Sequence, residues 1–511
     1  NFVGNVPLNR IDENFYEAKK ETELSLYRAS VKWDEPWFHV DGFFRTGHYH
    51  WASEGDVFAL YREANYGENI DLYNGEAPSG IELTGKLGLS GLKVAVGNEL
   101  YWGANPAVVG KYQRTVGAFD LAVVHQEDLA QAEGGGTSST TQVRQTRKTA
   151  LSVATKVLGV GVQLGGLWAN ANKVDETFAS DERAADGSYL VDRVRTEDTL
   201  GGRAKVTFEA GRIHWYAQGS YMGLVADGSP DPTITYTGWT LKDSGSGNQV
   251  NAMTGIAIDV GTLQIAPNLL WQKPLVGPTD PPRTLLDDQD PFAVRGNRET
   301  VAGELVLTWD PTPATWFWAW DNDFRENAPL AASLGISYRH QPTSQDSAIG
   351  YLEDGVTQIA IGAPPPHDLW EARTRVVSRL SHALRLVGNA WIGTAEPNGE
   401  DARLVHRMGA DLRLGWNALL VQAIAKKDDY GPYDYHRDWN LTFPVQLIGD
   451  ASYVLGGARW IPGLTQQTRI GVRGTWRYLD RYSPRYANAS DPGTPDWGNE
   501  YELRTYLSVT L

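Results

Sequence analysis

Arginine recurs at alternate positions between residues 370 and 504, and it is the residue type here with the clearest capacity for chemistry. The members are Arg373, Arg375, Arg379, Arg385, Arg403, Arg407, Arg413, Arg469, Arg473, Arg477 and Arg504. A planar guanidinium binds carboxylate, phosphate or sulfate through paired hydrogen bonds. The same arginines could instead pair with carboxylates such as Asp411, Asp450 and Glu502 and fix the shape of a polar wall. Both interpretations stay open for any single arginine, and the cluster as a whole favours anion binding.

Two other segments are rich in aromatic and polar residues. In Glu99–Pro106, Tyr101 and Trp102 offer ring faces, and Asn105 before Pro106 favours a tight turn. This segment is a candidate constriction or sugar contact, with a plain strand-ending turn as the alternative. The segment 57–75 could fold inward and narrow an interior.

Motifs for catalysis are missing from the sequence. It contains neither a Gly-x-Ser-x-Gly turn nor His-Glu-x-x-His, so we predict no catalytic residues and no cofactor, and the chain is not expected to be an enzyme. His48 and His50 would share one side of a strand, but no third ligand accompanies them. We therefore predict no metal site.

The elements that position these residues are predicted to be β-strands, because apolar and polar residues alternate along the chain. In 499–511, Leu503, Leu507 and Val509 share one face, while Glu502 and Arg504 share the other. Similar alternation occurs near 21–33, 37–46, 81–87, 92–101, 107–115, 119–127, 147–158, 160–170, 197–209, 213–225, 248–260, 263–272, 299–309, 315–324, 329–340, 346–353, 370–380, 384–394, 402–414, 417–427, 440–455 and 466–478. No amphipathic helix competes, so the fold class is all-β.

The connections between these segments alternate in length. Short links such as 210–212, 260–262 and 415–416 alternate with long ones such as 128–146 and 171–196. Short turns at one end and long loops at the other indicate a single antiparallel up-and-down β-barrel of about 22–24 strands, with about 18 as the fallback. We assign residues 21–511 to the barrel and residues 1–20 to an N-terminal segment or loop.

Composition agrees with a barrel whose apolar face meets lipid. Hydrophobic residues make up only 41%, no stretch is apolar enough for a membrane helix, and 19 Trp and 23 Tyr outnumber 13 Phe. We expect apolar faces to carry aromatic anchors near strand ends, namely Trp168, Trp215, Trp309, Trp316, Trp391, Trp476 and Tyr501. The net charge of −16 argues against a nucleic-acid partner. The competing fold is a large soluble all-β protein, such as a propeller or a sugar-binding sandwich array. No repeat of about 40–50 residues supports a propeller.

The alternating strands, the turn and loop asymmetry and the amphipathic last segment resemble the outer-membrane porin and exporter barrels of Gram-negative bacteria. That resemblance implies an outer-membrane channel for passive diffusion or export of hydrophilic, anionic solutes or polysaccharide through an arginine-rich interior. The implied partners are outer-membrane lipid, the solute or polymer, and a candidate periplasmic or lumenal protein. Two alternatives keep the same architecture: a wide barrel enclosing a lipoprotein plug or electron carrier, and a surface glycan-binding barrel with a closed lumen.

Overall fold

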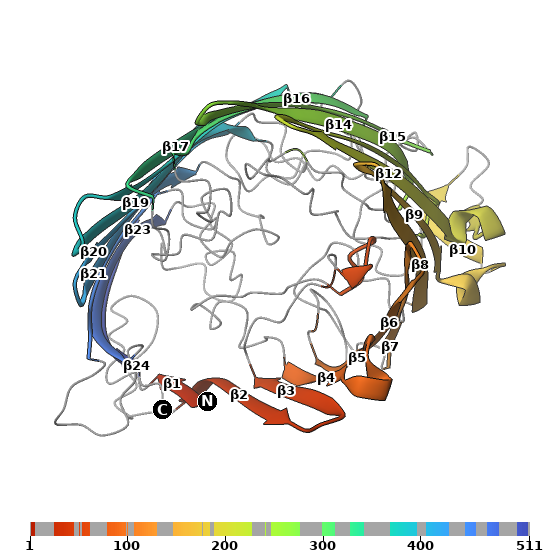
Figure 1. The fold of residues 1–511 in the computed structure, drawn as a ribbon, viewed down its shortest axis with the longest axis horizontal. Helices are drawn as coiled ribbons and strands as arrows, with labels where there is room; N and C mark the ends of the chain where they lie inside the picture. The colour runs from red at the N-terminus through yellow and green to blue at the C-terminus, as the bar shows by residue number, and fades with distance from the viewer. Residues whose placement is uncertain are drawn as a thin grey trace.

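The computed structural model describes residues 2–5, 25–44, 51, 54–61, 79–98, 100, 107–129, 147–175, 177–183, 189–226, 241, 247–275, 299–311, 328–341, 368–395, 405–428, 445–455, 468–479 and 498–508. Within these described residues, twenty-two antiparallel strands form one sheet, which curves into a ring (Figure 1). The predicted all-β, up-and-down architecture is confirmed, and the strand number lies within the predicted range.

The strands follow one another around the ring in chain order. They are β1 (Phe2–Asn5), β2 (Ser25–Asp34), β3 (Phe38–Phe44), β4 (Ser79–Gly85), β5 (Leu92–Asn98), β6 (Ala107–Val116), β7 (Phe119–Asp128), β8 (Arg147–Val157), β9 (Val160–Ala169), β12 (Leu200–Ala210), β13 (Ile213–Met222), β14 (Gln249–Val260), β15 (Leu263–Pro274), β16 (Thr300–Trp309), β17 (Leu330–His340), β18 (Leu369–Arg379), β19 (Leu384–Ala395), β20 (Val405–Trp416), β21 (Leu419–Asp428), β22 (Val445–Val454), β23 (Arg469–Leu479) and β24 (Gly498–Ser508). The first and last strands come within contact distance, so the ring's two edges meet (Figure 1).

A few short elements lie outside this sheet. Strands β10 (Thr177–Arg183) and β11 (Tyr189–Arg193) pair only with each other, between β9 and β12. The 3₁₀ turns η3 (Leu87–Leu89), η4 (Ala171–Lys173) and η5 (Thr196–Thr199) belong to connections. None of the helical turns in the described ranges has the length and hydropathy needed to cross a membrane.

The structure differs from the sequence pattern at two places in the strand order. Strand β1 lies within residues 1–20, which the pattern assigns to a segment or loop, and it pairs with β2. The predicted segments 315–324 and 346–353 lie outside the described residues. Strand β16 pairs directly with β17, and β17 pairs directly with β18, so the ladder leaves no place for another strand between these neighbours.

Short turns gather at one end of the barrel, which we call the turn end, and the opposite end is the loop end. Two-residue turns join β6 to β7, β8 to β9 and β12 to β13 at the turn end. In the turn Leu158–Gly159, both residues have positive φ, at 53° and 81°, as a type I′ hairpin turn requires. The links 310–329 and 455–468 are longer members of the turn-end set.

Apolar side chains cover the outer face of the ring. Leu151, Leu269 and Leu503 are 54%, 62% and 72% exposed, and Trp168, Trp309 and Tyr501 are exposed near strand ends. In water, so much exposed apolar surface would be unfavourable, whereas a bilayer solvates it. The alternation therefore places an apolar band outside, as the sequence predicted.

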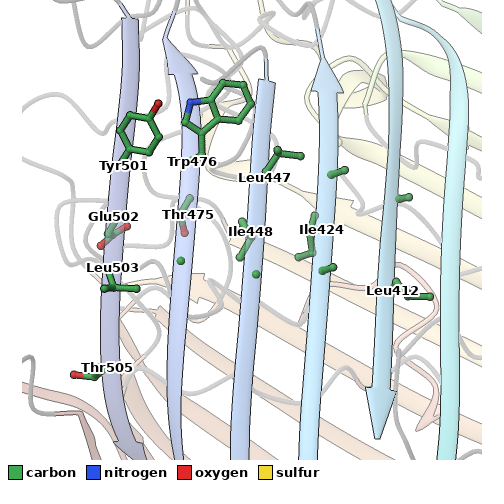
Figure 2. A pocket seen from close by; sticks show the side chains of 15 residues that line it. Leu412, Ile424, Leu447, Ile448, Thr475, Trp476, Tyr501, Glu502, Leu503 and Thr505 are labelled. Atoms are coloured by element: carbon green, nitrogen blue, oxygen red, sulfur yellow. The ribbon is translucent and has the colours of Figure 1, made fainter.

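The outer face also has one shallow depression of about 910 Å³ across β20–β24 (Figure 2). Its floor is made of small residues: Gly449 and Gly474 lie directly opposite each other, and Ala423 lies beside Gly449. Larger side chains, including Leu412, Leu447, Trp476 and Leu503, also line it.

Candidate functional site

The inner face of the ring carries polar side chains in the rows between the apolar ones. Asn251 donates to Ser220 Oγ across 2.7 Å, and the Tyr216 hydroxyl donates to Asn268 Oδ1 across 3.1 Å. All of these residues are buried. Buried polar groups need such partners, so the interior wall is a hydrogen-bonded surface rather than an apolar core.

Residues 51 and 54–61 lie inside the ring, where we call them the inward loop (the orange fragment in Figure 1). Asp56 organises the loop because its two carboxylate oxygens accept hydrogen bonds from the Leu60 and Tyr61 amides, each 2.9 Å away. Trp51 and Tyr61 pack ring against ring at 4.4 Å, and both are almost completely buried. The predicted inward folding of this part of 57–75 is thus observed for residues 57–61.

Wall residues from β8 and β12 hold the inward loop by its backbone. Ser152 Oγ donates to the Gly55 carbonyl across 2.9 Å, and the Arg203 guanidinium donates to the Val57 carbonyl. Gly55 has φ of 91°, and a Cβ placed on it would lie 2.3 Å from the Ala122 Cβ. Only glycine fits this contact, because it tolerates both the backbone angle and the close approach.

A pair of lysines faces the loop from the neighbouring strands β5 and β6. Lys93 and Lys111 lie directly opposite each other, and both bind the Glu54 carboxylate, with a Lys93–Glu54 distance of 2.8 Å. Their ammonium groups also lie 5.9 and 5.6 Å from the Trp51 ring centroid. Burial opposes ionisation of Glu54, but hydrogen bonds from Lys111 and Lys93 outweigh it, and the pKa of Glu54 is lowered. Two cations thus share one anion.

The second carboxylate of the inward loop predicts a pH dependence. Burial raises the pKa of Asp56 to about 6, although the two amides oppose the rise. Because this value exceeds the unfolded one, docking of the loop is favoured most below pH about 4 and weakens by about 3 kcal/mol as pH rises through 6. We expect hydrogen exchange in 54–61, corrected for intrinsic rates, to show stronger protection at pH 5 than at pH 7.5. Asp56→Asn should flatten the dependence; protection that rises with pH would contradict it.

Five of the eleven arginines in the predicted cluster face the interior and bind carboxylates of the described residues. Arg373 lies 3.4 Å from Glu304, Arg413 lies 3.1 Å from Asp411, and Arg473 lies 2.9 Å from Asp450. Arg477 and Arg504 share Glu502. The shape-fixing interpretation therefore holds for these five.

The remaining arginines have other surroundings. Arg375 is completely buried, and Arg379 and Arg385 lie directly opposite each other on β18 and β19. Arg407 is half-buried on β20, and Arg469 is exposed at the start of β23. Arg403 lies outside the described residues.

One aromatic prediction is wrong. Trp391 lies on the interior face, directly opposite Arg373 on β18, instead of on the apolar face. Its ring covers Gly409 on β20, where an added Cβ would lie only 2.2 Å away. The glycine therefore leaves the space that the ring fills. Trp316 lies outside the described residues.

The other predicted site residues cannot be placed in the same way. Tyr101, Trp102 and Asn105 lie outside the described residues, as do His48 and His50. Leu100, which immediately precedes Tyr101, is completely buried and packs in one cluster with Trp51, Phe58 and Tyr61 of the inward loop. Within the part of the chain that the structure describes, no group of three or more His, Asp or Glu could hold a metal ion.

Sequence reasoning missed the cationic wall beneath the inward loop. Lys93, Lys111, Arg203 and Lys205 all lie on inner faces of β5, β6 and β12. The sequence could have identified them as interior cations, because they occupy polar-face positions within the predicted strands 92–101, 107–115 and 197–209. Interior cations therefore gather on two separate arcs, β5–β12 and β18–β24.

The wall itself defines the class of protein. Its outer face is apolar, its inner face is polar and charged, and every strand of the ring is antiparallel to its neighbours. A bilayer core requires that backbone groups be paired within the protein, and a sheet curled on itself satisfies this requirement. The protein is a transmembrane β-barrel of the outer-membrane type.

Comparison with known proteins adds distant likenesses only. No family model matches the chain, and no curated protein matches it. Among solved structures, Pseudomonas aeruginosa OccK10 (OpdN) is 12% identical with a TM-score of 0.32, over 95% of this chain and 99% of that one. Pseudomonas aeruginosa OccK3 (OpdO) is 10% identical with a TM-score of 0.34, over 93% of each chain. A bacterial polysaccharide outer membrane secretin is 8% identical with a TM-score of 0.29, over 78% of this chain and 100% of that one. Likenesses this distant do not define what the present protein transports.

Proposed function

We propose that this protein is an outer-membrane channel through which hydrophilic, anionic solutes or an acidic polysaccharide pass by diffusion or export. The observation that carries the proposal is the sharing of carboxylates by interior cations. Glu54 serves both Lys93 and Lys111, and Glu502 serves both Arg477 and Arg504. Clustered interior cations of this kind attract anions and favour their passage.

The inward loop supports selective passage rather than unselective diffusion through a wide pore. It covers part of the wall from β5 to β13 through buried contacts of Trp51, Phe58 and Tyr61. A second inward contact comes from Leu241, which packs with Tyr216, Met253 and Leu270 on β13–β15. Segments from the connections therefore occupy interior space that a barrel of 22 strands would otherwise leave open.

Conductance across a planar bilayer tests the proposal. Purified protein reconstituted in a salt gradient should give ohmic channels whose reversal potential favours chloride over potassium. A cation-selective channel would contradict the anion preference. A barrel that conducts only with a co-purified protein would support the enclosing alternative, and one that never conducts would support the closed glycan-binding alternative.

Substitutions in the interior should shift this selectivity in opposite directions. Arg473→Gln with Arg504→Gln removes two opposed charges on β23 and β24, and we expect the chloride-to-potassium permeability ratio to fall by about twofold. The matched change Asp450→Asn removes the carboxylate beside Arg473 and should raise the ratio. The reversal potential measures both. If the two variants move the ratio in the same direction, the wall charge does not set selectivity.

A further inference from the structure

Lys205 is a buried cation on the inner face of β12, with only 6% of its surface exposed. Its ammonium group lies 6.0 Å from the Tyr216 ring centroid, and the ring face attracts the cation but carries no net charge. Among the residues that the structure describes, no carboxylate forms an ion pair with Lys205 and no atom accepts a hydrogen bond from it. A buried charge without a partner is strongly unfavourable, so Lys205 calls for an anion that these residues do not supply.

The residues directly opposite Lys205 on both neighbouring strands are glutamines, Gln163 on β9 and Gln218 on β13. Gln218 is buried, and its Oε1 accepts a hydrogen bond from the Arg203 guanidinium across 3.1 Å. Its Nε2 is buried as well and donates to none of the described residues. A buried donor without an acceptor is costly. Lys205 and Gln218 Nε2 therefore need the same kind of partner, and one anion can serve both.

Lys111 shows how the same wall compensates a buried lysine. It is 3% exposed, much like Lys205, and it binds the Glu54 carboxylate of the inward loop. The inward loop also reaches β12, but there it presents a backbone carbonyl, that of Val57, which accepts from Arg203. The loop thus brings a carboxylate to one buried lysine and only a neutral group to the strand of the other.

The inward loop covers Lys205 on its loop-end side. Residues 57–58 pack there so closely on Gly165 of β9 that an added Cβ would lie 2.9 Å from each of them. On the turn-end side the wall becomes more open, because Thr207 is half-buried and Glu209 is exposed. A solute in the interior can therefore reach Lys205 from the turn end.

We propose that Lys205 and Gln218 form a carboxylate-binding site in the inner wall, directly on the turn-end side of the inward loop. Neighbouring strands lie about 4.8 Å apart, so one carboxylate can accept from Lys205 Nζ with one oxygen and from Gln218 Nε2 with the other. Its single charge matches the single charge of Lys205. The ligand is a carboxylate group of the solute or polymer that the channel carries. This identity of the ligand as cargo rests on the proposed function, whereas the chemistry of the site does not.

Saturation-transfer NMR of the full chain in detergent tests the site without any need for conduction. The probe is propionate, and propionamide is the uncharged ligand of the same shape. We expect propionate to bind at least about tenfold more tightly than propionamide, and Lys205→Met to abolish this difference. The matched control is Lys156→Met, which removes another lysine of the inner face, one that binds its own carboxylate, Glu209. The control should leave the affinity for propionate within about twofold.

Gln163→Glu tests the site while Lys205 is kept. The change places a carboxylate directly opposite Lys205, as the chain itself does with Glu54 at Lys111. We expect the new carboxylate to bind Lys205, so that propionate binding is lost and the midpoint of urea unfolding rises. Lost binding with a lowered midpoint would mean that the new charge only repels the probe, and Lys205 would then not be the cation that binds it.

Two further results would overturn the site. These are equal binding of propionate and propionamide to the unaltered protein, and equal weakening of propionate binding by Lys205→Met and Lys156→Met. The proposed function is decided separately, by conductance. A channel without anion preference that binds propionate through Lys205 would defeat the proposed function and leave the site in place, and an anion-selective channel that does not bind propionate would do the reverse.

Discussion

Gly55→Ala should release the inward loop and raise single-channel conductance at least about twofold, the largest functional effect that we expect from a single methyl group. The added Cβ would lie 2.3 Å from the Ala122 Cβ, and φ of 91° is a left-handed angle that alanine disfavours. Neither strain is relieved while the Gly55 carbonyl stays bonded to Ser152. Undocking also frees Glu54 from Lys93 and Lys111, so the anion preference should increase together with the conductance.

Gly117→Ala is the matched control for this change. Gly117 also has positive φ, at 62°, but an added Cβ there meets nothing within 4 Å, and the residue lies in the turn between β6 and β7. We expect unchanged conductance, because φ of 62° is an angle that alanine adopts at modest cost and the wall contact is absent. If Gly55→Ala conducts like the unaltered protein, the inward loop does not narrow the path.

The period of two was enough to predict the wall because side chains on a strand have only two directions. Leu412 and Asp411 are neighbours in β20, yet the first is 48% exposed outside and the second is buried inside. Any contiguous alternation between turns therefore predicts both a strand and its faces. Trp391 was misassigned on residue type alone, although its alternation with Ile392 already placed it on the arginine face.

Contacts between distant segments could not be predicted in this way. The inward loop binds Ser152 and Arg203, which are 97 and 146 residues from their partners Gly55 and Val57. Nothing in a local pattern specifies such a pairing. Register across a short turn is different: the turn between β18 and β19 fixes Arg379 opposite Arg385, whereas Lys93 and Lys111 are joined through the longer link 99–106, whose length leaves register open.

Leu412→Arg should produce the largest loss of stability, because it would place a charge on the lipid-facing side near the middle of β20. An arginine at the bilayer midplane costs a membrane barrel about 2–4 kcal/mol. Ile424→Arg is the matched control: Ile424 is on the neighbouring strand β21, but it lies directly opposite Asp411 on the inner face. There the new guanidinium lies on the polar inner face beside the carboxylate that Arg413 also binds, so we expect a loss of less than about 1 kcal/mol.

Urea unfolding of the two variants in lipid vesicles measures this difference. If Leu412→Arg fails to fold while Ile424→Arg folds, the prediction is still supported, because only the outward position is then intolerant of charge. The opposite ranking would mean that the apolar face is covered by protein and not by lipid. The interior charges would then no longer line a path across a membrane, and the roles proposed for the lysine and arginine pairs would have to change with it.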